Sequence, residues 1–291
     1  MSIRTDLALE SINAAKISEG ITKTERGKAF KITEINIAED KHGEKIGKKK
    51  GKYITLEGSV FSCFSKDFRE MCEEFSEELS QFVPDGKVLV VGLGNNDITP
   101  DALGPQTASK ILATRHLKEE LKDEDDFLTS LRPVGVLASG VLGQTGIETA
   151  ELIDGLMEKI DPQAIIAVDA LACSDINRLG KTIQLSDTGI SPGSGVQNKR
   201  RELSEATLGV PVIAVGVPTV VDMHTIVHDY TGNKISGSMP NMMVTPRDID
   251  RLIERSASMI AAGINMTLHP QMSFEAVSYT HLRAHETGRN L

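Results

Sequence analysis

Short apolar segments that alternate with stretches of helical spacing constrain this chain more than any other feature. Three of these segments, residues 87–92, 164–169 and 211–217, are apolar at almost every position. Strands that are apolar on both faces and separated by amphipathic helices are typical of a mostly parallel sheet covered by helices on both sides. We therefore predict an α/β fold with these three segments at the centre of the sheet.

Weaker patterns complete the expected order of elements. Short strands are expected at 133–137 and 182–185. Apolar residues recur at helical spacing between 65 and 82, and Cys72 lies within that stripe, which favours a packing role for its thiol. The other expected helices span 101–116, 146–160, 219–228 and 245–262, the last with Thr245 as N-cap and Pro246 in its first turn.

The N-terminal part of the chain has a different pattern. Residues 1–19 are expected to form a helix or an arm. Residues 20–57 alternate polar and apolar positions, as strands with one solvated face do, and predict a small β-rich lobe. Within this lobe, the run from Lys48 to Lys52 favours an exposed hairpin tip over a docking patch for an acidic partner. We expect one domain over 1–276.

Composition excludes several classes of function. The formal net charge is -9 and Trp is absent, which argues against a nucleic-acid partner. Three cysteines without Cys-x-x-Cys spacing are typical of a reducing cytosol and offer no zinc knuckle. No secretory signal and no membrane-spanning run is visible, so we expect a cytoplasmic protein. Residues 277–291 are polar and unpatterned, and we expect a non-native or disordered tail that excludes His281 and His285 from the site.

Two aspartates are the strongest candidates for chemistry. Asp101 follows the first apolar strand, and Asp169 is expected to end the second. Right-handed crossovers bring the carboxyl ends of parallel strands to one edge, so the two side chains can lie side by side. Such a pair shares a proton, so that one carboxylate acts as general base on water and the other as general acid, with no metal or cofactor. The alternative is structural: a helix N-cap at Asp101 and a loop anchor at Asp169.

Other motifs give weaker indications. The loop that begins at Gly92 lacks the third glycine of a dinucleotide fingerprint, because Asp97 stands there. The Gly-rich segment 186–200 could form an oxyanion or substrate cradle, or simply a tight turn, and Ser194 is not in a nucleophile-elbow motif. His224 and His228 have metal-ligand spacing but lack the Glu of a zinc-peptidase helix, which favours two partly exposed histidines.

Nine stretches of sequence, in one order along the chain, carry a resemblance to the germination protease family of spore-forming bacteria. They are residues 3–8, 51–57, 92–95, 99–105, 143–149, 168–172, 186–190, 192–196 and 215–222. The family's proposed catalytic aspartates match Asp101 and Asp169. Polar residues of the same motifs are predicted to support the substrate or the loops around it: Asn95, Asp97, Thr145, Glu148, Asp187 and Ser194.

The resemblance implies an aspartic-type endopeptidase that degrades small acid-soluble spore proteins during germination. It also implies a cytoplasmic enzyme of the spore interior, made as a zymogen, assembled as a homotetramer and similar in fold to hydrogenase maturation peptidases. Three features depart from the family pattern. Few residues precede Arg4, so we expect a short pro-segment or weak zymogen control; an insertion often seen after Asp222 is missing; and His224 and His228 do not belong to the pattern.

Two rival hypotheses remain at this point. The first is a metal-dependent peptidase of the hydrogenase-maturation type, which a chelator would inactivate. The second is a binding module without catalysis, which would hold a protein partner through the Gly-rich loops.

Overall fold

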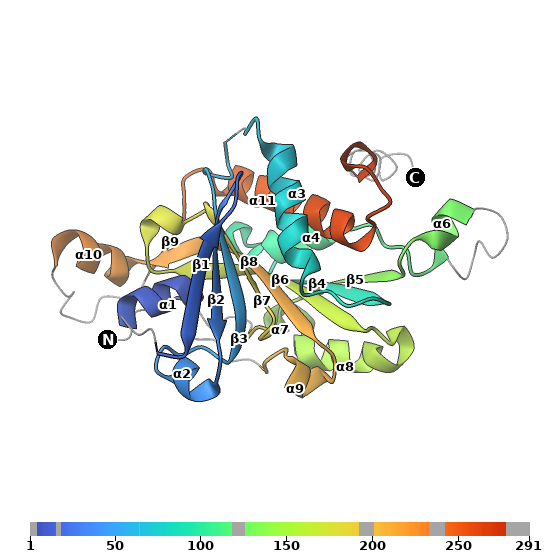
Figure 1. Cartoon of the computed structure of the whole chain (residues 1–291), viewed down its shortest axis with the longest axis horizontal. Helices are drawn as coiled ribbons and strands as arrows, with labels where there is room; N and C mark the ends of the chain where they lie inside the picture. The colour runs from blue at the N-terminus through green and yellow to red at the C-terminus, as the bar shows by residue number, and fades with distance from the viewer. Residues whose placement is uncertain are drawn as a thin grey trace.

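The computed structural model of this chain describes residues 5–15, 19–63, 65–117, 126–191, 201–232 and 242–277. The strands in these ranges form one nine-stranded sheet with helices on both faces (Figure 1). Across the sheet the order is β1-β2-β3-β7-β8-β6-β4-β5, and β9 pairs with β8. The predicted α/β class is confirmed. Ser194, His281, His285 and the expected tail beyond Val277 lie outside the described residues.

The centre of the sheet is parallel, as the apolar segments predict. The strands β4 (Val88–Leu93), β6 (Ala164–Cys173) and β8 (Val212–Asp222) are neighbours, and β5 (Val134–Gly140) continues the parallel part beyond β4. Because these strands run the same way, their carboxyl ends reach one edge of the sheet, where sites of α/β proteins gather.

The N-terminal strands extend this same sheet. The strands β1 (Ile21–Arg26), β2 (Lys31–Ile37) and β3 (Gly51–Glu57) form an antiparallel meander. Its last strand pairs with β7 (Thr182–Ser186), which in turn pairs antiparallel with β8. The predicted β-rich segment is therefore continuous with the parallel centre, and a mixed sheet results.

Alternate residues of the central strands pack against two helical layers. Val88 and Val90 of β4 face α3 (Phe68–Ser80), α4 (Leu103–Ala108) and α11 (Ile249–Leu268). Leu89 and Val91 face the opposite layer, which contains α8 (Thr149–Ile160) and α9 (Glu205–Leu208). Figure 1 shows α3, α4 and α11 above the sheet and α8 and α9 below it. This two-sided burial explains why the central strands carry hardly any polar residues.

Two central strands are longer than the sequence suggested. The strand β6 was expected to end at Asp169 but continues to Cys173, because residues 170–173 pair with β8. The strand β8 likewise continues to Asp222, so the expectation of a helix from 219 is wrong. The helix α10 (Met223–Thr231) begins after Asp222, whose carboxylate accepts from the backbone N–H of His224 at 2.7 Å.

Two predicted helices begin or end elsewhere. The segment 101–116 contains the short turn η1 (Thr99–Asp101) and α4, not one long helix. The helix α11 starts at Ile249 after Asp248, and Thr245 instead donates its hydroxyl to the Thr219 carbonyl at 2.9 Å. Other helical elements in the described ranges are α1 (Ala8–Ala15), α2 (Asp40–Glu44), α6 (Asp126–Ser130), α7 (Leu142–Thr145) and η2 (Ile176–Arg178); β9 is Met243–Val244.

Cysteine burial agrees with the packing interpretation. Cys72 is fully buried between α3 and α11, and burial raises the pKa of its thiol to about 12. Burial also raises the pKa of Cys173. Both thiols are therefore protonated near neutral pH, the state in which a cysteine is unreactive. Within the described part of the chain, no helix combines the length and the apolar character needed to cross a membrane.

Candidate active site

The loop after β4 is folded tightly around Asp101. Gly94 has φ +108°, and a side chain there would place its Cβ 2.1 Å from the Asp101 carbonyl oxygen. Beyond this turn, the Asn95 N–H donates to Asp101 Oδ2 at 2.7 Å, and the Asp101 N–H donates to the Ile98 carbonyl at 2.8 Å. The glycine is thus required by the close approach of the chain to itself, and the loop orients the Asp101 carboxylate.

Asp169 lies within β6 and is only 6% exposed. Its partner across the parallel pair is Gly216 of β8, and Gly216 in turn pairs with Gln184 of β7. Because directly opposite residues share one face of a sheet, Asp169 and Gln184 lie on either side of a position that has no side chain. The Ala170 N–H donates to Asp169 Oδ1 at 2.9 Å. Burying a charged side chain in a strand costs free energy unless the charge is compensated. Here Asp169 lines a cavity next to the strand.

The two aspartates line the same cavity, which has a volume of about 690 Å³. Its floor is the face of β6, β8 and β7 that carries Asp169, Gly216 and Gln184. Asp101 and Asn95 reach it from the carboxyl end of β4. The geometry therefore places on one cavity two carboxylates that are separated in sequence by the whole of β5 and the helices on either side of it.

Lys48 forms part of the cavity wall, so the expectation that the whole lysine-rich run is an exposed tip is wrong at this residue. Its ammonium donates to the Asp6 carbonyl at 2.7 Å, and Gln184 Nε2 donates to the same oxygen at 3.0 Å. Burial of the ammonium lowers the pKa of Lys48. Lys49 also lines the cavity, and its ammonium pairs with Glu202 at 2.6 Å.

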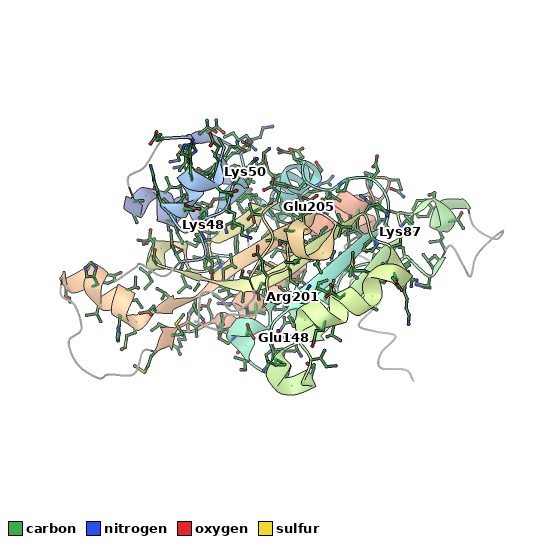
Figure 2. The ribbon with its side chains drawn as sticks, turned by 90° about the horizontal axis from the view of Figure 1, so that it is seen from below. Lys48, Lys50, Lys87, Glu148, Arg201 and Glu205 are labelled. Carbon is green, nitrogen blue, oxygen red and sulfur yellow. The ribbon has the colours of Figure 1, made fainter. Side chains whose placement is uncertain are left out.

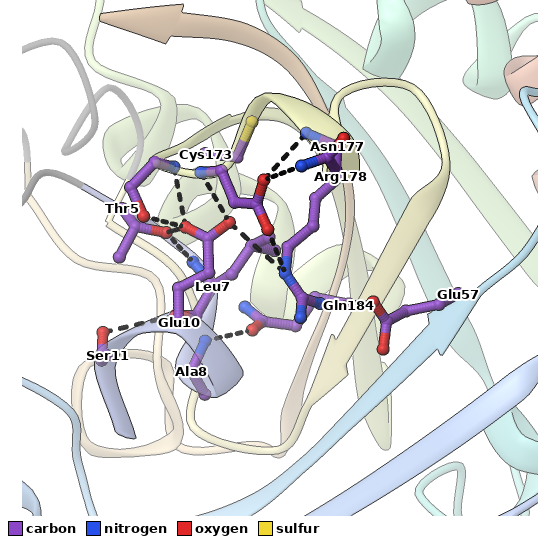
Figure 3. Close-up of polar contacts among 12 residues, drawn as sticks. Thr5, Leu7, Ala8, Glu10, Ser11, Glu57, Cys173, Asn177, Arg178 and Gln184 are labelled. Atoms are coloured by element: carbon purple, nitrogen blue, oxygen red, sulfur yellow. Dashed lines mark hydrogen bonds and ion pairs between the residues drawn. The ribbon is translucent and has the colours of Figure 1, made fainter. Parts of the chain in front are cut away.

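The N-terminal segment is held against the sheet by a polar cluster, which we call the N-terminal anchor: Thr5, Asp6 and Glu10 with Ser174 and Arg178. Figure 3 shows Thr5, Glu10 and Arg178 of this cluster. Glu10 is 6% exposed and accepts from the Ser174 N–H at 2.7 Å and from its hydroxyl at 2.6 Å. The Asp6 N–H donates to the Ala172 carbonyl at 3.0 Å. These contacts fix the position of Asp6, which also lines the cavity.

Sequence reasoning missed Asp6, Lys48 and Gln184. Lys48 lies in a run of lysines, and composition alone gives no sign that one of them is turned inward. Gln184 alternates with apolar residues in β7, and that period could have indicated a polar side chain on the cavity face.

The structure locates the other predicted residues as follows. Asn95 lines the cavity, and Gln144 Nε2 joins it to Asp97, with donor distances of 2.6 Å and 2.9 Å. Asp187 lies at the edge between β3 and β7, where it accepts from the Lys52 N–H at 2.8 Å. Asp97 and Asp187 are not among the residues that line the cavity.

Thr145 and Glu148 also lie off the cavity, around the start of α8. The Thr145 hydroxyl accepts from the Ile147 N–H at 3.1 Å, and the Glu148 N–H donates to Glu151 at 3.1 Å. Figure 2 shows Glu148 well apart from Lys48. These contacts organise the turn before α8, and a part for either residue in substrate binding stays a prediction.

The histidines of α10 do not face a set of further ligands. Neither His224 nor His228 lines the cavity, and Asp222 caps the helix on which they lie. Among the described residues, no group of three or more His, Cys, Asp and Glu side chains is arranged to hold a metal ion.

Comparison with known proteins agrees with the motifs. A family model described as germination protease matches residues 4–235. A germination protease of Clostridium acetobutylicum is 39% identical, over 95% of this chain and 98% of the relative. That of Caldanaerobacter subterraneus subsp. tengcongensis is 40% identical, over 94% and 96%. That of Priestia megaterium is 36% identical, over 96% and 97%. This chain therefore belongs to the germination protease family.

Proposed function

We propose that this protein is an endopeptidase that starts the degradation of small acid-soluble spore proteins during germination, with Asp101 and Asp169 as its catalytic carboxylates. The observation that carries the proposal is that both aspartates line one cavity at the carboxyl end of adjacent parallel strands. The cavity volume of about 690 Å³ falls within the usual range of ligand-binding pockets in proteins. On this proposal the reaction takes place in the interior of the germinating spore.

The chemistry follows from the shared environment of the pair. Two neighbouring carboxylates do not both ionise easily, so one retains a proton near the working pH. The ionised member removes a proton from a water molecule, whose oxygen attacks the peptide carbonyl carbon. The protonated member donates to the carbonyl oxygen. As the C–N bond breaks, the proton removed from water reaches the leaving nitrogen, and a hydroxyl of the intermediate returns a proton to the second carboxylate. Protons and electrons balance within the pair, the water and the peptide.

The test replaces each carboxylate by its isosteric amide. Asp101→Asn and Asp169→Asn are each expected to lower kcat on a purified small acid-soluble spore protein by roughly 10³-fold. Asp161→Asn is the matched control, because Asp161 is an exposed carboxylate at the far end of α8 that pairs with Lys87. Cleavage is followed by gel electrophoresis and mass spectrometry, and circular dichroism verifies that each variant is folded.

Three results would contradict the proposal. Full cleavage by both amide variants would remove the aspartate pair from the mechanism. Loss of wild-type activity on dialysis against a chelator, with recovery on adding a divalent metal, would favour the metal-dependent alternative. Binding of the spore protein without any cleavage by the wild type would select the binding module.

A further inference from the structure

An irregularity in β8 lies directly beside the loop that carries Asp101. In the pairing of β6 with β8, Leu171 is opposite Pro218 and Ala172 is opposite Val220, so Thr219 is an extra residue. This is a β-bulge, which re-aims the side chain of the extra residue and often occurs next to active sites. The extra residue of the bulge is therefore positioned to contact the loop that carries Asp101.

The side chain of Thr219 is turned toward the catalytic loop. Thr219 is 1% exposed, and its hydroxyl donates to the Pro100 carbonyl at 2.7 Å. That carbonyl belongs to the peptide bond that leads into Asp101. On its other side, the Thr219 carbonyl accepts from the Thr245 hydroxyl at 2.9 Å. Thr219 thus bonds to two segments: its carbonyl to Thr245, just after β9, and its hydroxyl to the loop after β4.

The loop also has internal hydrogen bonds, which fix its shape without fixing its position on the sheet. The Asn95 and Asp101 amides bond within residues 95–101. The Thr219 hydroxyl, in contrast, joins this loop to β8, the strand that pairs directly with the one bearing Asp169. A contact of this kind controls the separation of the two carboxylates, since one is on the loop and the other is on the paired strand.

We propose that Thr219 is a positioning residue for the aspartate pair: its hydroxyl, aimed by the β-bulge, holds the Pro100–Asp101 peptide so that Asp101 is placed against Asp169. It is not the nucleophile, because the hydroxyl hydrogen is donated to a backbone carbonyl. The inference rests on the proposed function, since it concerns the geometry of the proposed pair.

The test separates positioning from packing. Thr219→Val keeps the shape and loses the hydroxyl. We expect kcat to fall about tenfold with KM changed by less than about twofold: Thr219 lines the cavity, but its hydroxyl is donated to the Pro100 carbonyl and not to the substrate. Thr219→Ser keeps the hydroxyl and is expected to retain kcat within about threefold of wild type. Thr114→Val is the matched control, because Thr114 is also 1% exposed and its hydroxyl also donates to a backbone carbonyl, of Arg132, at the start of β5.

The pH profile supplies a readout that lost stability does not move. When two carboxylates separate, their titrations become less coupled, so the two apparent pKa values of the pair approach one another. Thr219→Val is therefore expected to narrow the bell-shaped profile of kcat from both sides, while Thr114→Val leaves its width unchanged. If Thr219→Val does not fold, Thr219→Ser and Thr219→Ala give the same comparison, since they differ from each other only in the hydroxyl.

Each outcome decides the question. A loss of kcat with a narrowed profile in the hydroxyl-free variants alone supports the positioning role. Equal losses in Thr219→Val and Thr114→Val, or a Thr219→Ser enzyme as slow as the hydroxyl-free variants, overturn it. Retained activity in Asp101→Asn and Asp169→Asn refutes the proposed function itself, whereas their inactivity together with a normal Thr219→Val enzyme refutes only the inference on Thr219.

Discussion

The N-terminal anchor and the cavity lined by Asp101 and Asp169 each contain a carboxylate that is 6% exposed, Glu10 in the first and Asp169 in the second. Glu10 is enclosed by donors from two segments: the Thr5 hydroxyl on one side, and the Ser174 hydroxyl at 2.6 Å with the Arg178 guanidinium at 3.7 Å on the other. Asp169 instead lines a cavity of about 690 Å³ together with Asp101. The extent of burial is the same, and the surroundings differ.

On the proposed function, this difference separates a structural carboxylate from a catalytic one. A buried charge is tolerated where enough donors surround it, and such a group stabilises the fold. A buried charge beside an open volume has room for a water molecule and a substrate. The two regions should therefore respond to mutation in opposite ways, one in stability and the other in activity.

Removing the carboxylate of the cavity should give the largest effect. Asp169→Asn is expected to lower kcat roughly 10³-fold while the free energy of unfolding changes by less than about 1 kcal/mol, because the amide has the same shape. Activity assays and urea unfolding at pH 7 measure the two quantities on the same preparation. A large loss of stability with proportionate activity per folded molecule would mean that Asp169 is a second anchor.

Removing the carboxylate of the anchor should have the opposite result. Glu10→Ala leaves the donors of Ser174 without their acceptor and weakens the enclosure of Arg178, at a cost of about 3 kcal/mol in the free energy of unfolding. The kcat per folded molecule should stay within about threefold of wild type, because Glu10 does not line the cavity. An unchanged free energy of unfolding in Glu10→Ala would mean that the anchor does not stabilise the fold through this carboxylate.

A buried histidine extends the comparison to a titratable side chain that belongs to neither the N-terminal anchor nor the cavity. His269 is fully buried next to the end of α11, and burial lowers its pKa to about 4. Below an unfolded-state value of 6.5 the unfolded chain binds the proton more readily, so stability falls as the pH falls from about 6.5 towards 4.

We expect this loss to be on the order of 2 kcal/mol at pH 5 relative to pH 7. Unfolding in urea at a series of pH values measures it, and the slope should be shallower in His269→Leu. Equal slopes in the two proteins would assign the acid sensitivity to other groups.

The smallest effect is expected at Lys48, where the cavity wall contains a charge. Its pKa in the folded protein is lowered by burial below the ordinary value of 10.5, so the unfolded chain holds the proton more firmly. The wild type should therefore gain stability relative to Lys48→Met as the pH rises towards 10.5, by about 1 kcal/mol or less. Thermal unfolding between pH 7 and 10 tests this, with Lys50→Met as the exposed control. A constant difference across that range would mean that the ammonium is solvated.

The sequence predicted those parts of the molecule in which one pattern dominates. The apolar runs of β4, β6 and β8 determined the parallel centre, because only strands covered on both faces are so uniformly apolar. The nearness of Asp101 and Asp169 to one edge followed from that topology alone. Strand ends were less predictable: Asp169 looked like a terminus, yet backbone pairing with β8 carries the strand past it.

The walls of the cavity depended on contacts that no local pattern encodes. Lys48 is turned inward because Asp6, forty-two positions earlier, offers a carbonyl to its ammonium. Thr219 reaches the catalytic loop through a one-residue shift of register, and such a shift depends on how two distant segments pair. Long-range partners of this kind are decided by the assembled fold.

The position of β8 has a consequence for the life of the chain in the cell. Asp101 and Asp169 are both synthesised before β8, but the cavity floor at Gly216 and the hydroxyl at Thr219 are part of that strand. A nascent chain that ends before β8 contains Asp101 and Asp169 but lacks the cavity floor at Gly216. The cavity is therefore complete only once β8 has been synthesised and has paired with β6.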